Sequence, residues 1–445
     1  MNPLPWRIRF EQRMRGEMMR RIDKTARLAA AGLLAAVLLA GCGAVPAGGA
    51  APEPQATPAP TARPASGPTA EAAPTVQPGR EYRAMWVSYL EWQAVDFTSE
   101  AAFTADVGRM LDDCVALGMN RVIAQVRPFS DALYPSEYFP WSHLCTGTQG
   151  QDPGFDPLDI LVREAHGRGL AIEAWVNPYR VRLDEKRPQG ELAALNPAAA
   201  HPEWAKQVDG GVYLDPANTE VQAYIVAGVQ EILENYPVDG IHFDDYFYPT
   251  TDPSFDEAEY KASGTSLPLA EWRRQNVNAL VSAVYRAVKA SSPTATFGIS
   301  PQGNPDNNYD GQYSDVPLWL STPGYVDYVL PQLYWGYGYQ LKNGGTRYAF
   351  ENIAAEWLAM ERAPGVALYL GLGAYRVGAG DGGRNEDSTS QWQSGHNLAD
   401  QVATGRQLGA DGYVLYRYDS LFRNSEWADL AAQEVQALAA VNGVG

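Results

Sequence analysis

Short apolar, β-rich runs alternate with helical patterns from Glu81 almost to the end of the chain, and this rhythm constrains the fold more than any other feature. Strands that are buried on both faces read as nearly continuous apolar runs, and their alternation with helices indicates a parallel sheet. Several strands are preceded by a turn containing glycine or aspartate, which ends the helix before it. The predicted strands are near Ala84–Tyr89, Arg121–Val126, Leu170–Val176, Gly240–Asp244, Thr296–Ser300, Val326–Leu333, Ala367–Leu372 and Gly412–Tyr416.

Eight strand–helix units over this length favour a single closed (β/α)8 TIM barrel over an open doubly wound sheet. Two of the predicted helices are Thr219–Asn235 and Trp272–Ala290. No glycine-rich phosphate-binding turn follows the first strand, which argues against a dinucleotide-binding sheet. Long loops rich in Trp, Tyr, Asn and Pro follow four strands, on the side where barrel enzymes carry their active sites. These loops are Pro128–Pro157, Pro178–Asn218, Tyr246–Leu269 and Gln302–Gly324.

The first eighty residues indicate export and tethering. Basic residues precede an apolar run, Leu28–Ala40, which is too short to cross a bilayer as a stable helix and is typical of a signal peptide. Its end, Leu39–Cys42, resembles a bacterial lipobox, so Cys42 is the predicted lipid attachment site. A plain secretory signal with a chance cysteine is the alternative. The segment that follows is rich in Ala, Pro, Thr and Gly and predicts a disordered tether.

The chain therefore divides into a signal peptide over residues 1–41, a lipidated cysteine with a disordered linker over 42–79, and a catalytic barrel over 80–445. This organisation predicts an extracytoplasmic protein, anchored in a bacterial cell envelope and attached to the membrane through its N-terminal lipid alone. Cys114 and Cys145 remain as one candidate disulfide pair. A bridge is permitted outside the cytoplasm, but two distant cysteines in a large domain indicate no disulfide framework.

The formal net charge of −18 argues against nucleic acid and against anionic lipid surfaces, because both require clustered Lys and Arg. The many Trp and Tyr residues fit a large core and sugar stacking equally well. No HxxxH or HxH pair is present, which argues against a zinc hydrolase, and no GxSxG motif is present. We expect no metal in the site and no cofactor, although a carboxylate-bound calcium ion is compatible with the sequence.

The segment around Asp244 and Asp245 is the strongest candidate for chemistry. His242 and Asp244 share one face of the fourth strand, because side chains alternate along a strand, and Asp245 lies just beyond its end. Catalytic residues collect at such strand ends in barrel enzymes. A cap on the next helix is the structural alternative, and it explains Asp239 better than Asp244.

Glycoside hydrolysis requires two carboxyl groups, roughly 5–9.5 Å apart depending on the stereochemistry. Asp244 is the predicted nucleophile or electrostatic stabiliser. Asp245 is the first candidate for the acid, and Glu173 on the third strand and Asp315 on the loop after the fifth strand are the others. The fifth strand itself ends without a carboxylate.

Polar and aromatic residues recur at the other strand ends and predict a sugar-binding cleft, although any one of them alone is explained equally well as a satisfied core group. Arg127 could hold a catalytic carboxylate in its ionised form by Coulomb attraction. The predicted substrate-binding residues are Arg127, Trp175, Asn177, Tyr179, His242, Tyr246, Gln302, Gln332, Tyr334, Trp335 and Tyr416.

Several stretches of the domain resemble the glycosyl hydrolase-like 10 family of bacterial envelope proteins. The matching stretches are Arg83–Val87, Gln125–Pro128, Ala174–Tyr179, Asp239–Pro249, Tyr313–Asp315 and Asp327–Trp335. The resemblance implies a (β/α)8 hydrolase that acts on glycan. For some members it implies cleavage of peptidoglycan strands that have lost their peptides.

Two more distant similarities bear on mechanism. Glu173 and Asn177 have the spacing of a third-strand motif of α-amylase-like enzymes, and His242 with Asp244 resembles their arginine–nucleophile pair. Asp239–Tyr246 also resembles the fourth-strand motif of chitinase-like enzymes. There the acid falls at the position of Tyr246, so a substrate-assisted mechanism lacks its usual acid in this sequence.

Three functions are compatible with these residues. The first is a monomeric glycosidase that cleaves cell-wall glycan, most plausibly peptide-free peptidoglycan. The second is a glycan-binding envelope lipoprotein without catalysis. The third is a glycosidase for a different extracellular polysaccharide.

Overall fold

Nine strand segments form one parallel sheet, and together they account for all eight predicted strands. The computed structural model describes residues 81–187, 190–384 and 386–444, so the predicted signal peptide, Cys42 and the tether lie outside the described residues. The strands are β1 (Tyr82–Val87), β2 (Arg121–Arg127), β3 (Ala171–Val176), β7 (Gly240–Phe243), β8 (Thr296–Ile299), β9 (Tyr328–Val329), β10 (Gln332–Leu333), β11 (Ala367–Leu372) and β12 (Gly412–Leu415).

The sheet closes on itself. Its order is β10-β11-β12-β1-β2-β3-β7-β8-β9, and β11 pairs with β9 as well as β10. β9 and β10 therefore occupy one position of the barrel. The sequence predicts a single strand over Val326–Leu333, and the structure divides it at Leu330 and Pro331, where the proline has no N–H to donate. The closed parallel sheet confirms the predicted (β/α)8 barrel.

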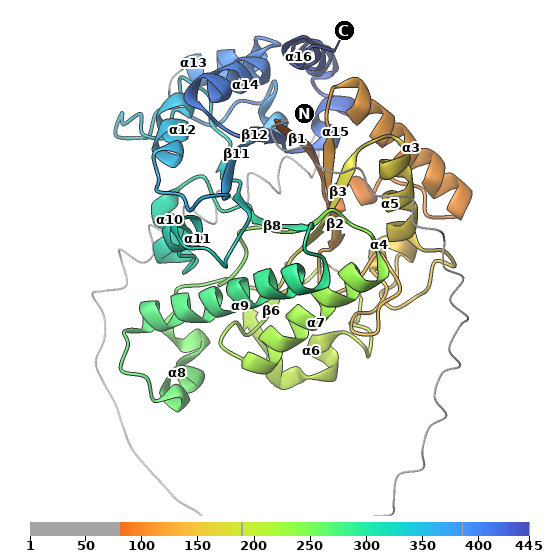
Figure 1. The fold of residues 1–445 in the computed structure, drawn as a ribbon, viewed down its shortest axis with the longest axis vertical. Helices are drawn as coiled ribbons and strands as arrows, with labels where there is room; N and C mark the ends of the chain where they lie inside the picture. Colours follow the sequence, from red (N-terminus) through yellow and green to blue (C-terminus); the bar gives the residue numbers. More distant parts are fainter. Residues whose placement is uncertain (1–80, 188–189, 385, 445) are drawn as a thin grey trace, which may run out of the picture. The chain divides into compact units, whose positions relative to one another are not determined.

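A helix follows each strand position and packs on the outside of the sheet (Figure 1). The predicted helix Thr219–Asn235 is α7, and α9 extends the predicted Trp272–Ala290 at both ends. The two helices pack against each other in the structure (Figure 1). The helices are α3 (Glu100–Ala116), α5 (Pro157–Gly167), α7 (Thr219–Asn235), α9 (Leu269–Ser291), α11 (Val316–Ser321), α12 (Phe350–Leu358), α14 (Asn397–Leu408) and α16 (Ala428–Val441).

The loops after the strands contain ordered elements of their own. The loop after β3 carries a small antiparallel sheet in the order β4-β6-β5, separate from the barrel. The α-helices and strands in these loops are α2 (Tyr89–Trp92), α4 (His143–Thr146), β4 (Arg180–Arg182), α6 (Pro197–Ala200), β5 (Ala205–Val208), β6 (Gly211–Leu214), α8 (Glu257–Ser263), α10 (Pro305–Gly311), α13 (Glu386–Ser390) and α15 (Tyr418–Phe422). Short 3₁₀ turns accompany them at Pro202–Trp204, Pro253–Phe255, Ala374–Arg376 and Gln391–Gln393.

Apolar side chains fill two separate regions. The larger core lies between the sheet and the helices, and a smaller cluster fills the barrel interior. Aromatic rings dominate that interior cluster, including Tyr82, Trp86, Trp175 and Tyr328. The interior is therefore a packed core, which is normal for a barrel of this size.

Cys114 in α3 and Cys145 in α4 are both buried and free, so they form no bridge. Burial raises the pKa of both thiols, which keeps them protonated and unreactive. Every helix within the described residues is too short or too polar to span a bilayer.

Candidate active site

Asp244 is buried at the carboxyl end of β7, with 3% of its surface exposed. The side-chain amide of Asn177, which follows β3, donates a hydrogen bond to Asp244 Oδ2. The backbone N–H of Tyr246 donates to Oδ1 over 3.3 Å. Asp244 and Asn177, which follow the neighbouring strands β7 and β3, are therefore in direct contact.

A chain of amide groups holds Asn177 in place. Its Oδ1 accepts hydrogen bonds from Gln125 at the end of β2 and from Arg180 Nη2, the latter at 3.0 Å. The side-chain oxygen Oε1 of Gln125 in turn accepts from the backbone N–H of Tyr89 at 2.7 Å. Residues of β2 and of α2, the short helix after β1, therefore fix the orientation of the side-chain amide that bonds Asp244.

Arg180 is the cation beside Asp244. It is nearly buried, donates from Nε to the Pro128 carbonyl at 3.0 Å, and lies over the rings of Phe129 and Tyr246 at 4.9 and 5.4 Å. Guanidinium groups pack favourably on aromatic faces, so the rings fix this charge in position.

Burial raises the pKa of Asp244 from its usual range to about 7. The positive charge of Arg180 opposes this shift, and the neighbouring carboxyl group of Asp245 adds to it. A carboxyl group in this range carries its proton for a substantial fraction of the time at neutral pH.

Asp245 is equally buried but accepts hydrogen bonds from the opposite side of the barrel mouth. Gln332 in β10 donates from Nε2 to Oδ1 at 2.9 Å, and Gln312 after α10 donates from Nε2 to Oδ2 at 3.1 Å. Gln332 Nε2 also donates to the carbonyl of Ser300 after β8. Asp244 therefore faces β2 and β3, whereas Asp245 faces the side of β8 and β10.

His242 lies below the pair inside the barrel and is fully buried. Burial lowers its pKa to about 3, so the imidazole is neutral. Nδ1 and Nε2 both lie 2.9 Å from hydroxyl groups, those of Tyr328 and Ser300 respectively. The structure therefore places this predicted substrate-binding residue in the packed interior, with both ring nitrogens already bonded.

Glu173 lies near the amino-terminal end of the barrel, away from the Asp244–Asp245 pair. Its carboxylate accepts from Arg121 and Tyr82 at 2.9 Å and from Tyr328 at 2.5 Å. Arg121, Tyr82 and Tyr328 are the first residues of β2, β1 and β9, respectively. Burial raises the pKa of Glu173, and the charge of Arg121 opposes that shift. The structure does not bring this acid candidate to the strand end.

Asp315 is also separate from the pair. It caps α11, where its side chain accepts from the backbone N–H of Leu318 at 3.3 Å. Partial burial raises its pKa, Arg274 lowers it and Glu271 raises it, and both of these neighbours belong to α9. Its surroundings are those of a helix cap.

Arg127 does not contact Asp244 or Asp245, contrary to the sequence-based expectation. The register of β2 and β3 shifts between Gln125 and Arg127, so the bulge turns Arg127 out of the barrel. Its guanidinium lies over the ring of Phe139 at 4.2 Å, and a Cβ atom at Gly228 of α7 would overlap both groups. Arg180 supplies the charge that was expected from Arg127.

Three predicted aromatic residues surround the strand ends. Tyr334 stacks on Tyr416 with ring centroids 5.5 Å apart, and burial raises the pKa of Tyr334, with Asp245 among the charges that add to the shift. Tyr375, which the sequence analysis did not single out, packs edge-on against both rings. We call Tyr334, Tyr375 and Tyr416 the tyrosine cluster. Tyr246 as a whole residue is 39% exposed.

The remaining predicted substrate-binding residues lie at varying depths. Trp175 is buried inside the barrel against His242, and Tyr179 is buried in the larger core. Gln302 bridges to Gln332 through the backbone, and its side chain accepts from Asn307 at 2.6 Å. Trp335 is half-buried and stacks on Tyr348 at 5.0 Å.

Sequence reasoning missed Gln125, Arg180, Ser300 and Gln312 as parts of the site. Gln125 and Ser300 stand at strand ends and carried the same signal as the residues that were chosen. Arg180 and Gln312 lie within loops, where no periodicity indicates direction. Among the described residues, no group of three or more His, Cys, Asp and Glu side chains could hold a metal ion.

Comparisons with known proteins identify the family of the chain. The model of the glycosyl hydrolase-like 10 family matches residues 81–390. The chain is 34% identical to the glycosyl hydrolase YngK of Bacillus subtilis over 75% of this chain and 67% of that protein. It is 35% identical to the glycosyl hydrolase DigH of Escherichia coli K12 over 68% of this chain and 75% of that protein.

Solved structures share the fold at low sequence identity. The PgaB (BpsB) glycoside hydrolase domain from Bordetella bronchiseptica matches with a TM-score of 0.50 and 14% identity, over 79% of this chain and 98% of that one. The β-galactosidase from Rahnella sp. R3 matches with a TM-score of 0.53 and 12% identity, over 84% and 58%. The chain belongs to the glycosyl hydrolase-like 10 family and is a glycosidase built on a (β/α)8 barrel.

Proposed function

We propose that the barrel hydrolyses cell-wall glycan, namely peptide-free peptidoglycan strands, with Asp244 and Asp245 as its two catalytic carboxyl groups. The observation that carries this proposal is the pair itself. Both acids are buried at the end of β7, and their hydrogen-bond donors come from opposite sides of the barrel mouth. Two neighbouring acids in different surroundings can hold one proton between them and perform separate roles.

The contacts support Asp244 as the general acid. Burial raises its pKa to about 7, so it can protonate the leaving glycosidic oxygen near neutral pH. Two side-chain amide groups donate to the two carboxyl oxygens of Asp245 and fix their orientation, which suits a nucleophile or a base that activates water. These roles reverse the expectation from the sequence, where Asp245 was the first candidate for the acid.

The exposed residue Tyr246 and the tyrosine cluster support sugar binding beside the pair. The cluster lies near Asp245, whose negative charge contributes to the raised pKa of Tyr334. Flat aromatic faces stack on the C–H groups of sugar rings. We expect a sugar unit to lie across these rings while its glycosidic bond meets Asp244.

Two variants with matched charge test the roles. Asp244→Asn should lose cleavage of purified peptide-free strands but retain cleavage of aryl glycosides with a good leaving group, which need no protonation. Asp245→Asn should lose both activities, by several orders of magnitude. The opposite pattern would exchange the roles, and wild-type activity in both variants would remove the pair from catalysis.

The substrate is tested by product analysis. Soluble fragments released from peptide-free strands by the wild-type protein, and from intact peptidoglycan only after its peptides have been removed, support the proposal. Binding to strands that remain uncleaved would favour a glycan-binding protein. Cleavage of another polysaccharide in a parallel panel, with peptide-free strands untouched, would identify a glycosidase of different specificity.

We also propose that Cys42 carries a lipid that anchors the protein outside the cytoplasm. The lipobox-like end of the apolar run and the Pro- and Ala-rich segment behind it support this location, since a tether lets the barrel reach a polymer beyond the membrane. Cys42→Ser should remove the labelling by radioactive fatty acid and release the protein from the membrane fraction. Labelled, membrane-bound Cys42→Ser protein would contradict the proposal.

A further inference from the structure

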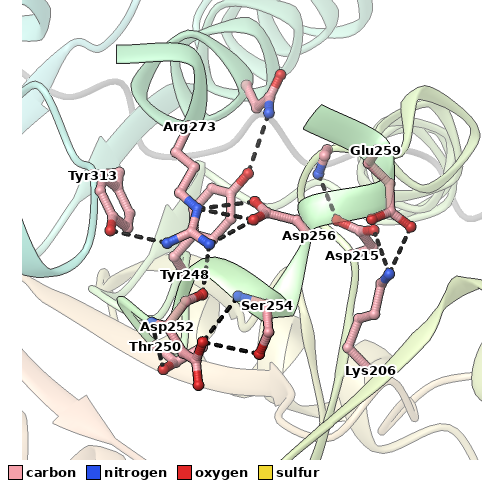
Figure 2. Close-up of polar contacts among 12 residues, drawn as sticks. Lys206, Asp215, Tyr248, Thr250, Asp252, Ser254, Asp256, Glu259, Arg273 and Tyr313 are labelled. Carbon is pink, nitrogen blue, oxygen red and sulfur yellow. Dashed lines mark hydrogen bonds and ion pairs between the residues drawn. The ribbon is translucent and has the colours of Figure 1, made fainter. Parts of the chain in front are cut away.

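Arg273 of α9 joins the two loops that carry the Asp245 side of the site. It is fully buried, and its guanidinium forms a two-pronged ion pair with Asp256, which is also fully buried, with Nε and Nη2 within 3.1 Å of the carboxylate (Figure 2). Nη2 also donates to the carbonyl of Asp252 at 2.8 Å. These contacts fasten the loop after β7, which contains Asp245, to the long helix α9.

The remaining nitrogen of Arg273 reaches the other loop. Nη1 donates to the hydroxyl oxygen of Tyr313 at 2.9 Å, and the guanidinium lies 5.0 Å from the centre of that ring (Figure 2). Tyr313 has a φ of +57°, a left-handed conformation that is uncommon for a residue other than glycine. Such a conformation persists only where the surroundings enforce it, and here a buried arginine holds the side chain.

Tyr313 immediately follows Gln312, which donates to Asp245 Oδ2. The backbone N–H of Gln312 also bonds to the carbonyl of Asn307 at 3.1 Å, so the amide group is supported from both sides along the chain. A single rigid path therefore leads from Arg273 through Tyr313 to the carboxylate of Asp245. The neighbouring Arg274 follows a different path, to Glu271 and the carbonyl of Tyr309.

We propose that Arg273 and Tyr313 are positioning residues, which hold Gln312 against Asp245 and thereby set the orientation of that carboxylate. The inference rests on the proposed catalytic role of Asp245. The ion pair with Asp256 alone would suffice to fasten the loop after β7. The bond to the Tyr313 hydroxyl also fastens the loop after β8, which carries Gln312, the donor to Asp245.

The test removes one hydroxyl group. Tyr313→Phe keeps the ring that the guanidinium contacts and deletes only the hydrogen-bond acceptor. We expect kcat on peptide-free glycan strands to fall about fivefold to tenfold with KM unchanged, because the loss of one buried hydrogen bond perturbs the geometry but not sugar binding. Arg274→Lys is the matched control on the adjacent path and should leave both constants unchanged.

A double-mutant cycle separates positioning from general destabilisation. Gln312→Met removes the donor itself, and Tyr313→Phe should add no further loss of kcat in that background, because both changes break one path. Additive losses, or a Tyr313→Phe enzyme with wild-type kcat, would overturn the inference.

Asp245→Asn distinguishes failure of the positioning role from failure of the proposed catalytic role. If that variant is inactive while Tyr313→Phe equals wild type, only the positioning role fails, and if it is fully active, the proposed catalytic role fails as well.

Discussion

Asn177 donates a hydrogen bond from its side-chain amide to Asp244, and this contact joins the ends of β3 and β7 at the mouth of the barrel. The side-chain oxygen of Asn177 accepts from Gln125 in β2 and from Arg180 in β4. These two segments therefore hold the amide that bonds the carboxyl group of Asp244. The position of Asp244 thus depends on side chains from three other segments of the chain.

Replacing Asn177 by alanine should therefore affect catalysis more than stability. Without the amide, the carboxyl group of Asp244 gains rotational freedom, and misplacement by about 1 Å costs about 10²-fold in rate. We expect kcat/KM on peptide-free strands to fall by that factor, while the melting temperature falls by only a few degrees. A variant that melts far below the wild type and retains kcat/KM would contradict this assignment.

The pH profile should show an alkaline limb near pH 7. An acid catalyst must carry its proton, and the raised pKa of Asp244 means that the protonated form disappears as the pH rises through about 7. Arg180 opposes the raised pKa, so Arg180→Gln should move the limb to higher pH. Measuring kcat/KM from pH 5 to 9 for both proteins checks the direction, and a limb that stays in place would contradict the role of Asp244 or of this charge.

Glu173→Gln should lose stability and retain activity, whereas the variants of Asp244 and Asp245 should lose activity. Its carboxylate neutralises the buried Arg121, and breaking a buried ion pair by removing one partner costs about 3–5 kcal/mol of folding free energy. We expect chemical denaturation to show that loss while kcat per folded molecule stays within about twofold of the wild type. A variant of normal stability with abolished cleavage would restore Glu173 as a candidate acid.

Glu434 should make stability depend on pH. It is fully buried in α16 and accepts from the backbone N–H groups of Asn397 and Leu398 at the start of α14. Burial raises its pKa to about 7, above the value of 4.5 for a free side chain. The folded state therefore binds a proton more tightly than the unfolded state, and this group's contribution to stability is greatest below pH 4.5 and declines as the pH rises to about 7.

Glu434→Gln removes this titration. The unfolding free energy of the variant minus that of the wild type should increase by about 2.5 kcal/mol between pH 5 and pH 8. Denaturation curves at the two pH values give this difference directly. An unchanged difference would show that Glu434 titrates alike in the folded and unfolded chains.

The fold was predictable because each strand is a short apolar run bounded by turns, and barrel strands are apolar because both of their faces are buried. Alternation along β7 also identified Asp244. Alternation gives the face of a strand but not the height. Glu173 shares a face with Asn177 and precedes it by four residues, about 13 Å lower in the barrel, and so it is bonded to Tyr82 and Arg121.

Two further differences come from events that periodicity does not encode. The bulge in β2 shifts the register by one position, and this turns Arg127 toward α7. Arg180 lies beyond the end of β3, where direction depends on the fold of a loop. Gln312 acquires its role because Tyr313, beside it, reaches a helix that is distant in sequence.

Arg180 is the first residue of β4 and pairs with Tyr213 in β6, so the charge beside Asp244 belongs to the small sheet and not to the barrel. The small sheet thus supplies the charge that opposes the effect of burial on the pKa of Asp244. Relatives could acquire a different working pH by replacing this appendage, while the strands that carry the carboxyl groups keep the same sequence.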